Sequence, residues 1–102
     1  MMSDMEAYRG RVQATIWDAA GWVSDERRAR AQRFLEHGEP AEAMCSLAWA
    51  ISEERTVVPR RIVASIRDLS AELVPFEEMP EDLDDFAIDE PTEGSGLPIA
   101  DG

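Results

Sequence analysis

Apolar side chains recur at intervals of three and four residues in four separate segments of this chain. That spacing places the apolar groups of each segment on one face of a helix with 3.6 residues per turn. It predicts helices from about Met5 to Gly21, from Ser24 to His37, from Ala41 to Glu54 and from Pro59 onward. The apolar faces expected to form the core are Met5, Tyr8, Val12, Ile16, Ala19 and Val23; Ala31, Phe34 and Leu35; Met44, Leu47, Ala48 and Ile51; and Ile62, Ile66, Leu69 and Leu73.

Residues with particular backbone preferences mark the ends of these helices. Ser24 is a typical N-cap, and the two acids after it favour the positive end of a helix dipole. Gly21 is expected to end the first helix, and Gly38 lies where a left-handed residue commonly follows the second. Pro40 and Pro59 suit a first helical turn, because the N–H that proline lacks has no partner there. Residues 56–58 should form an extended connection, since a residue before proline avoids the helical region.

The negative charge of the chain is concentrated at its C-terminal end. The 102 residues include 22 acids and ten bases, all of them Arg, for a net charge of -12. Residues 1–74 hold 12 acids and every Arg, whereas residues 75–102 hold ten acids, no base and four of the six prolines. We therefore predict an all-α bundle of three or four helices over residues 1–74. Residues 75–102 should form an acidic, largely disordered tail, with disorder at least beyond Asp89.

The predicted tail has an apolar pattern of its own, made by Phe76, Met79, Leu83 and Phe86. One interpretation is that the segment folds back and covers the open end of the bundle, and this is favoured for Phe76 and Met79. The other is an acidic amphipathic arm that binds a basic partner. This second interpretation stays open from Leu83 onward.

Few residues of the chain have the chemistry that catalysis or cofactor binding requires. One Cys and one His supply no set of metal ligands, and no phosphate-binding glycine loop or nucleophile motif is present. Cys45 lies beside the core face of the third helix and is expected to be a buried, inert thiol. His37 lies in the last turn of the second helix, where it favours an interaction with the helix dipole. The sequence thus predicts no catalytic residue, no metal and no cofactor, and a protein that is not an enzyme.

Composition also argues against several kinds of partner and location. The net charge opposes direct binding of nucleic acid or an anionic membrane. No stretch approaches the ~20 apolar residues of a membrane span, and Asp4 and Glu6, with no apolar run behind them, do not fit a secretory signal. We expect a cytoplasmic protein. The four arginines between residues 27 and 33 are expected to form a solvated face.

Trp49 lies on the side of the third helix opposite its apolar face, together with Glu42, Ser46 and Glu53. An aromatic ring flanked by carboxylates resembles a protein-binding hot spot. The alternative is that the third helix is central and that Trp49 packs on another helix. The residues predicted to bind a partner are Glu36, Glu39, Glu42, Ser46, Trp49, Glu53 and Glu54.

Residues 34–73 resemble small helical immunity proteins of bacterial polymorphic toxin systems, in particular the Maf-type group. The resemblance consists of a helix ending in a Gly-Glu turn, a following helix with regularly spaced apolar residues and a Glu near its end, and a further helix after an extended link. The matching positions are Gly38, Glu39, Ala43, Leu47, Ile51, Glu53, Glu54 and Pro59. The resemblance implies a protein that neutralises a cognate toxin by binding it, with the acidic face complementing a basic toxin.

Other functions remain open at this point. The chain is alternatively a regulatory or scaffold module that recruits a basic protein through its acidic tail, with the bundle as a dimerisation unit. A nucleic-acid mimic would need carboxylates spaced like phosphates on an ordered surface, and a small enzyme would need a pocket with a shifted pKa. A homodimer is compatible with each of these.

Overall fold

The computed structural model describes residues 4–71 and 73–89, and α-helices dominate this part of the chain. The fold is a small all-α bundle, as the apolar spacing predicted. The helices are α1 (Asp4–Asp18), α2 (Asp25–Glu36), α3 (Pro40–Glu54) and α4 (Arg60–Ser70); they are accompanied by two 3-10 turns, η1 (Phe76–Glu78) and η2 (Leu83–Phe86), and by two short strands, β1 (Val58–Pro59) and β2 (Ala87–Ile88).

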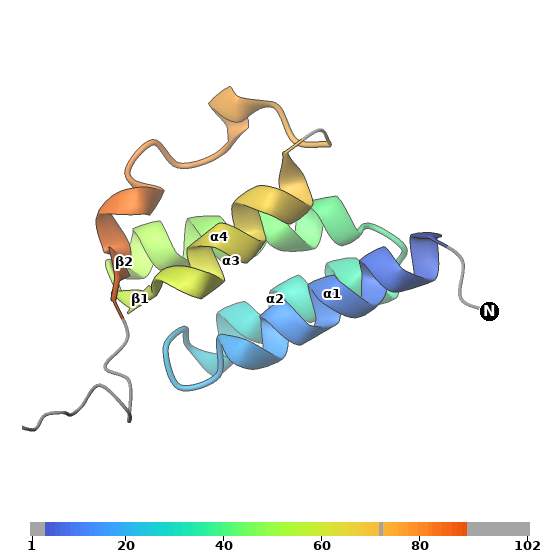
Figure 1. Cartoon of the computed structure of the whole chain (residues 1–102). Helices are drawn as coiled ribbons and strands as arrows, with labels where there is room; N and C mark the ends of the chain where they lie inside the picture. Colours follow the sequence, from blue (N-terminus) through green and yellow to red (C-terminus); the bar gives the residue numbers. More distant parts are fainter. Residues whose placement is uncertain (1–3, 72, 90–102) are drawn as a thin grey trace, which may run out of the picture.

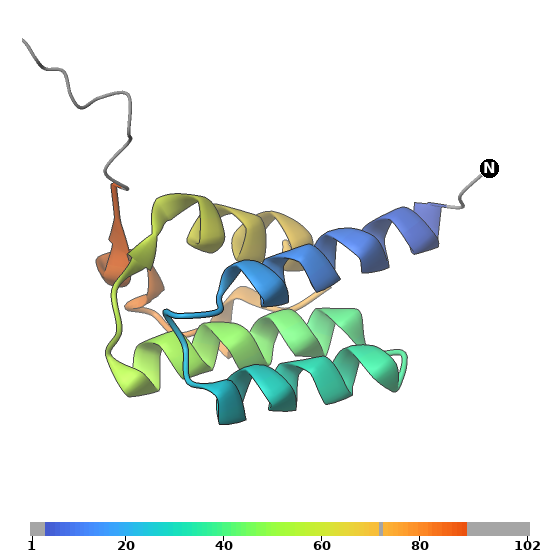
Figure 2. The same ribbon diagram turned by 90° about the horizontal axis from the view of Figure 1, so that it is seen from below.

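Helix α3 is the centre of the bundle, because it packs against α1, α2 and α4. Figure 1 shows α1 and α2 on one side of the molecule and α3 and α4 on the other, and Figure 2 shows α2 and α3 running side by side. The apolar face of α3 is fully buried, as are Ile16 of α1 and Ile62 and Ile66 of α4. The predicted core faces therefore meet in one cluster.

The helix-end signals at Ser24 and Gly38 are confirmed, whereas those at Gly21 and Pro59 lie outside the helices they were expected to bound. The Ser24 hydroxyl accepts a hydrogen bond from the backbone N–H of Arg27 and so caps α2. Gly38 follows α2 with a φ of 81°, a left-handed conformation that glycine adopts without strain. Helix α1 ends at Asp18, three residues before Gly21, which has a φ of 87° in the turn that follows. Pro59 precedes α4 as its N-cap residue and does not lie within the first turn.

Two residues assigned to the core from the sequence are exposed. Met5 lies in the first turn of α1 and is 59% exposed. Leu73 is 60% exposed because α4 ends at Ser70. The chain then turns, with the N–H groups of Leu73 and Val74 both bonded to the Ser70 carbonyl, and Val74 enters the core in place of Leu73. The prediction for Met5 and Leu73 was therefore wrong.

Residues 75–89, which we name the return segment, fold back along the outside of α3 and α4 (Figure 1). Met79 is buried, as the first interpretation expected, and Leu83 is fully buried as well, so the segment does not leave the bundle as a free arm at Leu83. Beyond Leu83 the chain forms β2, which pairs in parallel with β1, an element that sequence reasoning missed. The Phe76 side chain and the predicted disorder beyond Asp89 lie outside the described residues.

Polar contacts add to this packing of the return segment. The Ser52 hydroxyl donates a hydrogen bond of 2.7 Å to the carboxylate of Asp82. Arg67 of α4 forms an ion pair of 3.0 Å with Asp84. Exposed ion pairs contribute little free energy, so we attribute the docking of the segment mainly to the burial of Met79 and Leu83.

Candidate functional site

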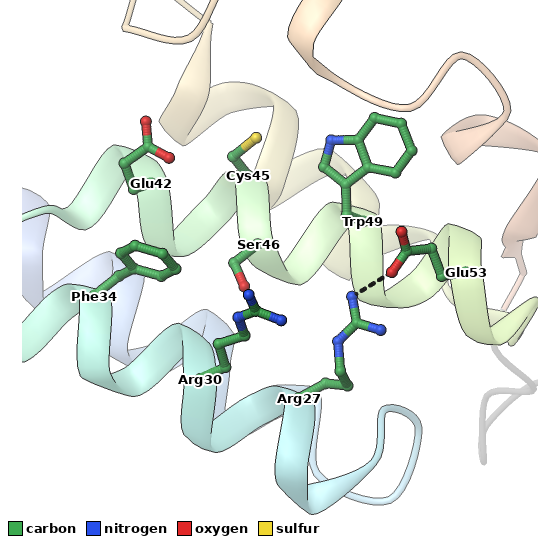
Figure 3. A pocket seen from close by; sticks show the side chains of 8 residues that line it. All are labelled: Arg27, Arg30, Phe34, Glu42, Cys45, Ser46, Trp49 and Glu53. Carbon is green, nitrogen blue, oxygen red and sulfur yellow. Dashed lines mark hydrogen bonds and ion pairs between the residues drawn. The ribbon is translucent and has the colours of Figure 1, made fainter.

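A groove of about 270 Å³ runs between α2 and α3 at the place where the sequence predicted the partner-binding face. Figure 3 shows that α2 and α3 line it from opposite sides. The predicted residues Glu42, Ser46, Trp49 and Glu53 all belong to it, so the helical-wheel grouping is confirmed. The complete set of lining residues is Arg27, Arg30, Phe34, Glu42, Cys45, Ser46, Trp49 and Glu53.

The groove carries both signs of charge, although sequence reasoning expected only acids there. Arg27 forms an ion pair of 2.7 Å with Glu53, drawn in Figure 3. Arg30 also lines the groove. The predicted solvated face of arginines is therefore only partly seen: Arg30 and Arg33 are exposed, whereas Arg27 and Arg28 are half-buried.

Trp49 stands at the edge of the groove with 38% of its surface exposed. Its indole N–H donates a hydrogen bond of 2.8 Å to the backbone carbonyl of Glu78 in the return segment. Helix α3 is indeed central, yet Trp49 lies on its outer side. On the far side of the ring a second hollow of about 400 Å³ includes Glu77, Glu81 and Asp82. The indole is thus held in one orientation between two hollows.

The surroundings of Trp49 are strongly acidic on the side of the return segment. Helix α3 and residues 75–89 together contain ten acids and no base. Glu42, Glu77 and Glu81 are exposed, and none of their carboxylates has a hydrogen bond or ion pair with another residue that the structure describes. These carboxylates therefore add to the negative field that an approaching molecule meets.

The other three residues predicted to bind a partner lie apart from the groove. Glu54 accepts two hydrogen bonds from Ser24, one from its N–H at 3.1 Å and one from its hydroxyl at 2.5 Å, and so ties the start of α2 to the end of α3. Glu36 accepts a hydrogen bond from Gln32 on its own helix. Glu39 is the N-cap residue of α3 at the opposite end of the groove.

Cys45 and His37 are both less buried than a core residue. Cys45 is half-buried, not fully buried as expected. Its thiol donates to the Glu78 carbonyl at 3.6 Å. Burial raises the pKa of the Cys45 thiol, and the negative charges of Glu42 and Glu78 raise it further. His37 is exposed at the C-terminal end of α2, the position that the dipole interaction requires.

The raised pKa of Cys45 gives a direct prediction of its reactivity. Because the thiolate is the reactive form, alkylation by iodoacetamide at pH 8 should be slower than that of a free cysteine. Replacement of Glu42 by Gln removes one negative charge, lowers the pKa and should speed the reaction. The measurement is the alkylation rate against pH by mass spectrometry. Glu36→Gln serves as control, and equal acceleration by both variants would contradict the assignment.

Sequence reasoning missed three kinds of residue at this site: the arginines and Phe34 of α2, Cys45, and the acids of the return segment. The α2 residues could have been predicted from the sequence. Arg27, Arg30 and Phe34 are spaced by three and four, and the short turn between α2 and α3 makes these helices antiparallel neighbours. Glu77 and Glu81 reach Trp49 only because a distant part of the chain folds back, which no local pattern shows.

No protein-family model, curated protein or solved structure matches this chain. Within residues 4–71 and 73–89, no group of three or more His, Cys, Asp or Glu side chains is arranged to hold a metal ion. In the same ranges, no helix has the length and apolar character needed to cross a membrane.

Proposed function

We propose that this chain is a non-catalytic inhibitor that binds a basic protein through the surface around Trp49. The observation that carries the proposal is the Trp49 ring itself, exposed between two hollows and held by its hydrogen bond to the Glu78 carbonyl. Tryptophan is enriched among residues that dominate binding energy. A ring already held in place loses little conformational freedom on binding, which favours affinity.

The charge around the ring supports a basic partner. Glu42, Glu77 and Glu81 line the two hollows that Trp49 also lines, and their carboxylates have no partners among the described residues. Such a field speeds the approach of a positively charged protein and discourages an acidic one. The two arginines of the groove add a condition, because a partner that also fills the α2–α3 groove must offer an acid or a hydrogen-bond acceptor to Arg30.

The resemblance of residues 34–73 to immunity proteins makes the proposed partner more specific. In this form of the proposal the partner is the toxin domain of a polymorphic toxin system, and the inhibitor neutralises it in the bacterial cytoplasm. An interface of standard size, about 1,600 Å² in total, would take ~800 Å² from this chain. One face of a molecule with a surface of 6172 Å² supplies that area.

The test begins with a search for a gene beside this one that encodes a large secreted protein, and continues with co-expression of that protein's C-terminal domain. We expect that domain to stop bacterial growth, the full chain to restore it, and the two to elute together in size-exclusion chromatography. Growth arrest that the chain does not relieve, with separate elution, would reject the proposal. So would the absence of any such gene beside this one.

Truncation distinguishes the alternative, recruitment of a basic protein by an acidic tail. Seven of the ten acids in residues 75–102 lie in the return segment. Deletion of residues 90–102 removes the remaining three and leaves every described contact in place. Full growth rescue by the truncated chain supports binding by the Trp49 surface, whereas loss of complex formation would favour the tail.

A further inference from the structure

Helix α1 begins and α4 ends at the end of the bundle away from β1 and β2 (Figure 1). A largely apolar hollow lies between residues at this end. Its volume is about 530 Å³. Met5 and Tyr8 of α1 form one wall, Pro40 and Ala41 of α3 another, and Leu73 after α4 the third. We name this the end hollow.

Met5, in the first turn of α1, and Leu73, in the turn that follows α4, are about 60% exposed and both line the end hollow. Much of the apolar surface of these two side chains is therefore not covered by the residues that the structure describes. Such apolar area is unfavourable in water and commonly marks a binding surface. The Tyr8 side chain in the wall of the hollow is held in place by a hydrogen bond of 2.5 Å from its hydroxyl to the Leu69 carbonyl.

The rim of the end hollow is uniformly acidic. Asp4, Glu39 and Glu42 line it, and no base does so within the described ranges. None of these three carboxylates has a hydrogen bond or ion pair with another described residue. A second copy of this chain would not fit, since a two-fold contact would bring two acidic rims together. The charge instead selects an occupant that combines apolar and basic side chains.

We infer that the end hollow docks a basic amphipathic helix of a partner protein. Apolar side chains three or four positions apart on a helix are neighbours, so one helix can insert two of them against Met5 and Leu73. Lysine or arginine on its flanks then faces the carboxylates of the rim. This inference goes beyond the proposed function, because it involves a separate surface that shares Glu42 with the groove and requires no contact with Trp49.

The test uses the full chain and two synthetic 14-residue peptides with the same leucine pattern, one with lysine and one with glutamate at all other positions. Titration calorimetry should detect binding of the leucine–lysine peptide alone. Leu73→Ser should weaken this binding about tenfold or more, since it removes a large apolar contact. Val57→Ser, at a residue 46% exposed and outside the hollow, should leave it unchanged.

The remaining outcomes each decide against the inference. Equal binding of both peptides would show that charge has no role, and equal weakening by both variants would show that the peptide does not select the hollow. Binding of the dye anilinonaphthalene sulfonate that Leu73→Ser abolishes, with no peptide binding, would assign the hollow to a small apolar ligand.

A separate variant distinguishes this inference from the proposed function. Trp49→Ala should retain peptide binding whether or not it binds the proposed toxin domain, so the two proposals can fail independently.

Discussion

Replacement of Leu83 by Asp should lower the free energy of unfolding by about 4 kcal/mol or more, whereas the same change at Leu73 should lower it by less than ~0.5 kcal/mol. Leu83 is fully buried in the return segment and belongs to the core cluster that includes Leu47 and Ile51. A carboxylate there would lose its hydration without gaining a partner. Leu73 is 60% exposed, so its variant keeps the charge in water.

Urea unfolding followed by circular dichroism at 222 nm measures both variants. A domain of this size commonly has ~5–15 kcal/mol of stability in total, so Leu83→Asp should leave the chain near its unfolding threshold. Leu83→Ala, with an expected loss of about 2–5 kcal/mol, stays measurable if the Asp variant does not fold. Similar values at positions 83 and 73 would show that the return segment is not part of the core.

Replacement of Trp49 by Ala should weaken binding of the proposed partner, a basic toxin domain, ~30-fold or more, equivalent to about 2 kcal/mol. The change removes the exposed ring and its hydrogen bond to the Glu78 carbonyl. Trp17→Ala is the matched control, because Trp17 lies on α1 with 65% of its surface exposed and outside both hollows. Its affinity should remain within about twofold of the unchanged chain.

Trp49→Phe separates the two contributions of the indole. It keeps an aromatic ring but removes the N–H, so we expect an intermediate loss of affinity. Titration calorimetry gives the dissociation constants, and thermal unfolding shows whether each variant is folded. Equal affinity of the partner for the Trp49 and Trp17 variants would show that the interface does not include the groove between α2 and α3.

The helices were predictable because their signals are local. The N-cap at Ser24, the left-handed Gly38 and the apolar face of α3 each depend on neighbours within one or two turns. The same local counting placed Trp49 with Glu42 and Glu53, and the structure has them in one groove. Periodicity alone thus predicted the middle of the bundle well.

Periodicity failed where the chain leaves a helix or meets a distant segment. The spacing of apolar residues predicted that the apolar face of α4 extends to Leu73. The chain instead turns after Ser70 and buries Val74. The strands β1 and β2 have only two residues each, which is too few to show an alternating pattern in the sequence. The partners of the groove acids were missed for the same reason, since Arg27 reaches Glu53 only once α2 and α3 are packed.

The pairing of Val58 with Ala87 has a consequence for the order in which the molecule assembles. The four helices and the contacts among them lie within residues 4–70, so they can form as soon as that part of the chain has been synthesised. The β1–β2 pair also needs residues 87 and 88, and it closes a further loop of about 30 residues, whose entropy must be lost before the contact forms. We expect the β1–β2 pair to form last. In a nascent chain, Leu83 and the Glu78 carbonyl that accepts the Trp49 hydrogen bond should therefore stay apart from the helices until residue 88 has left the ribosome.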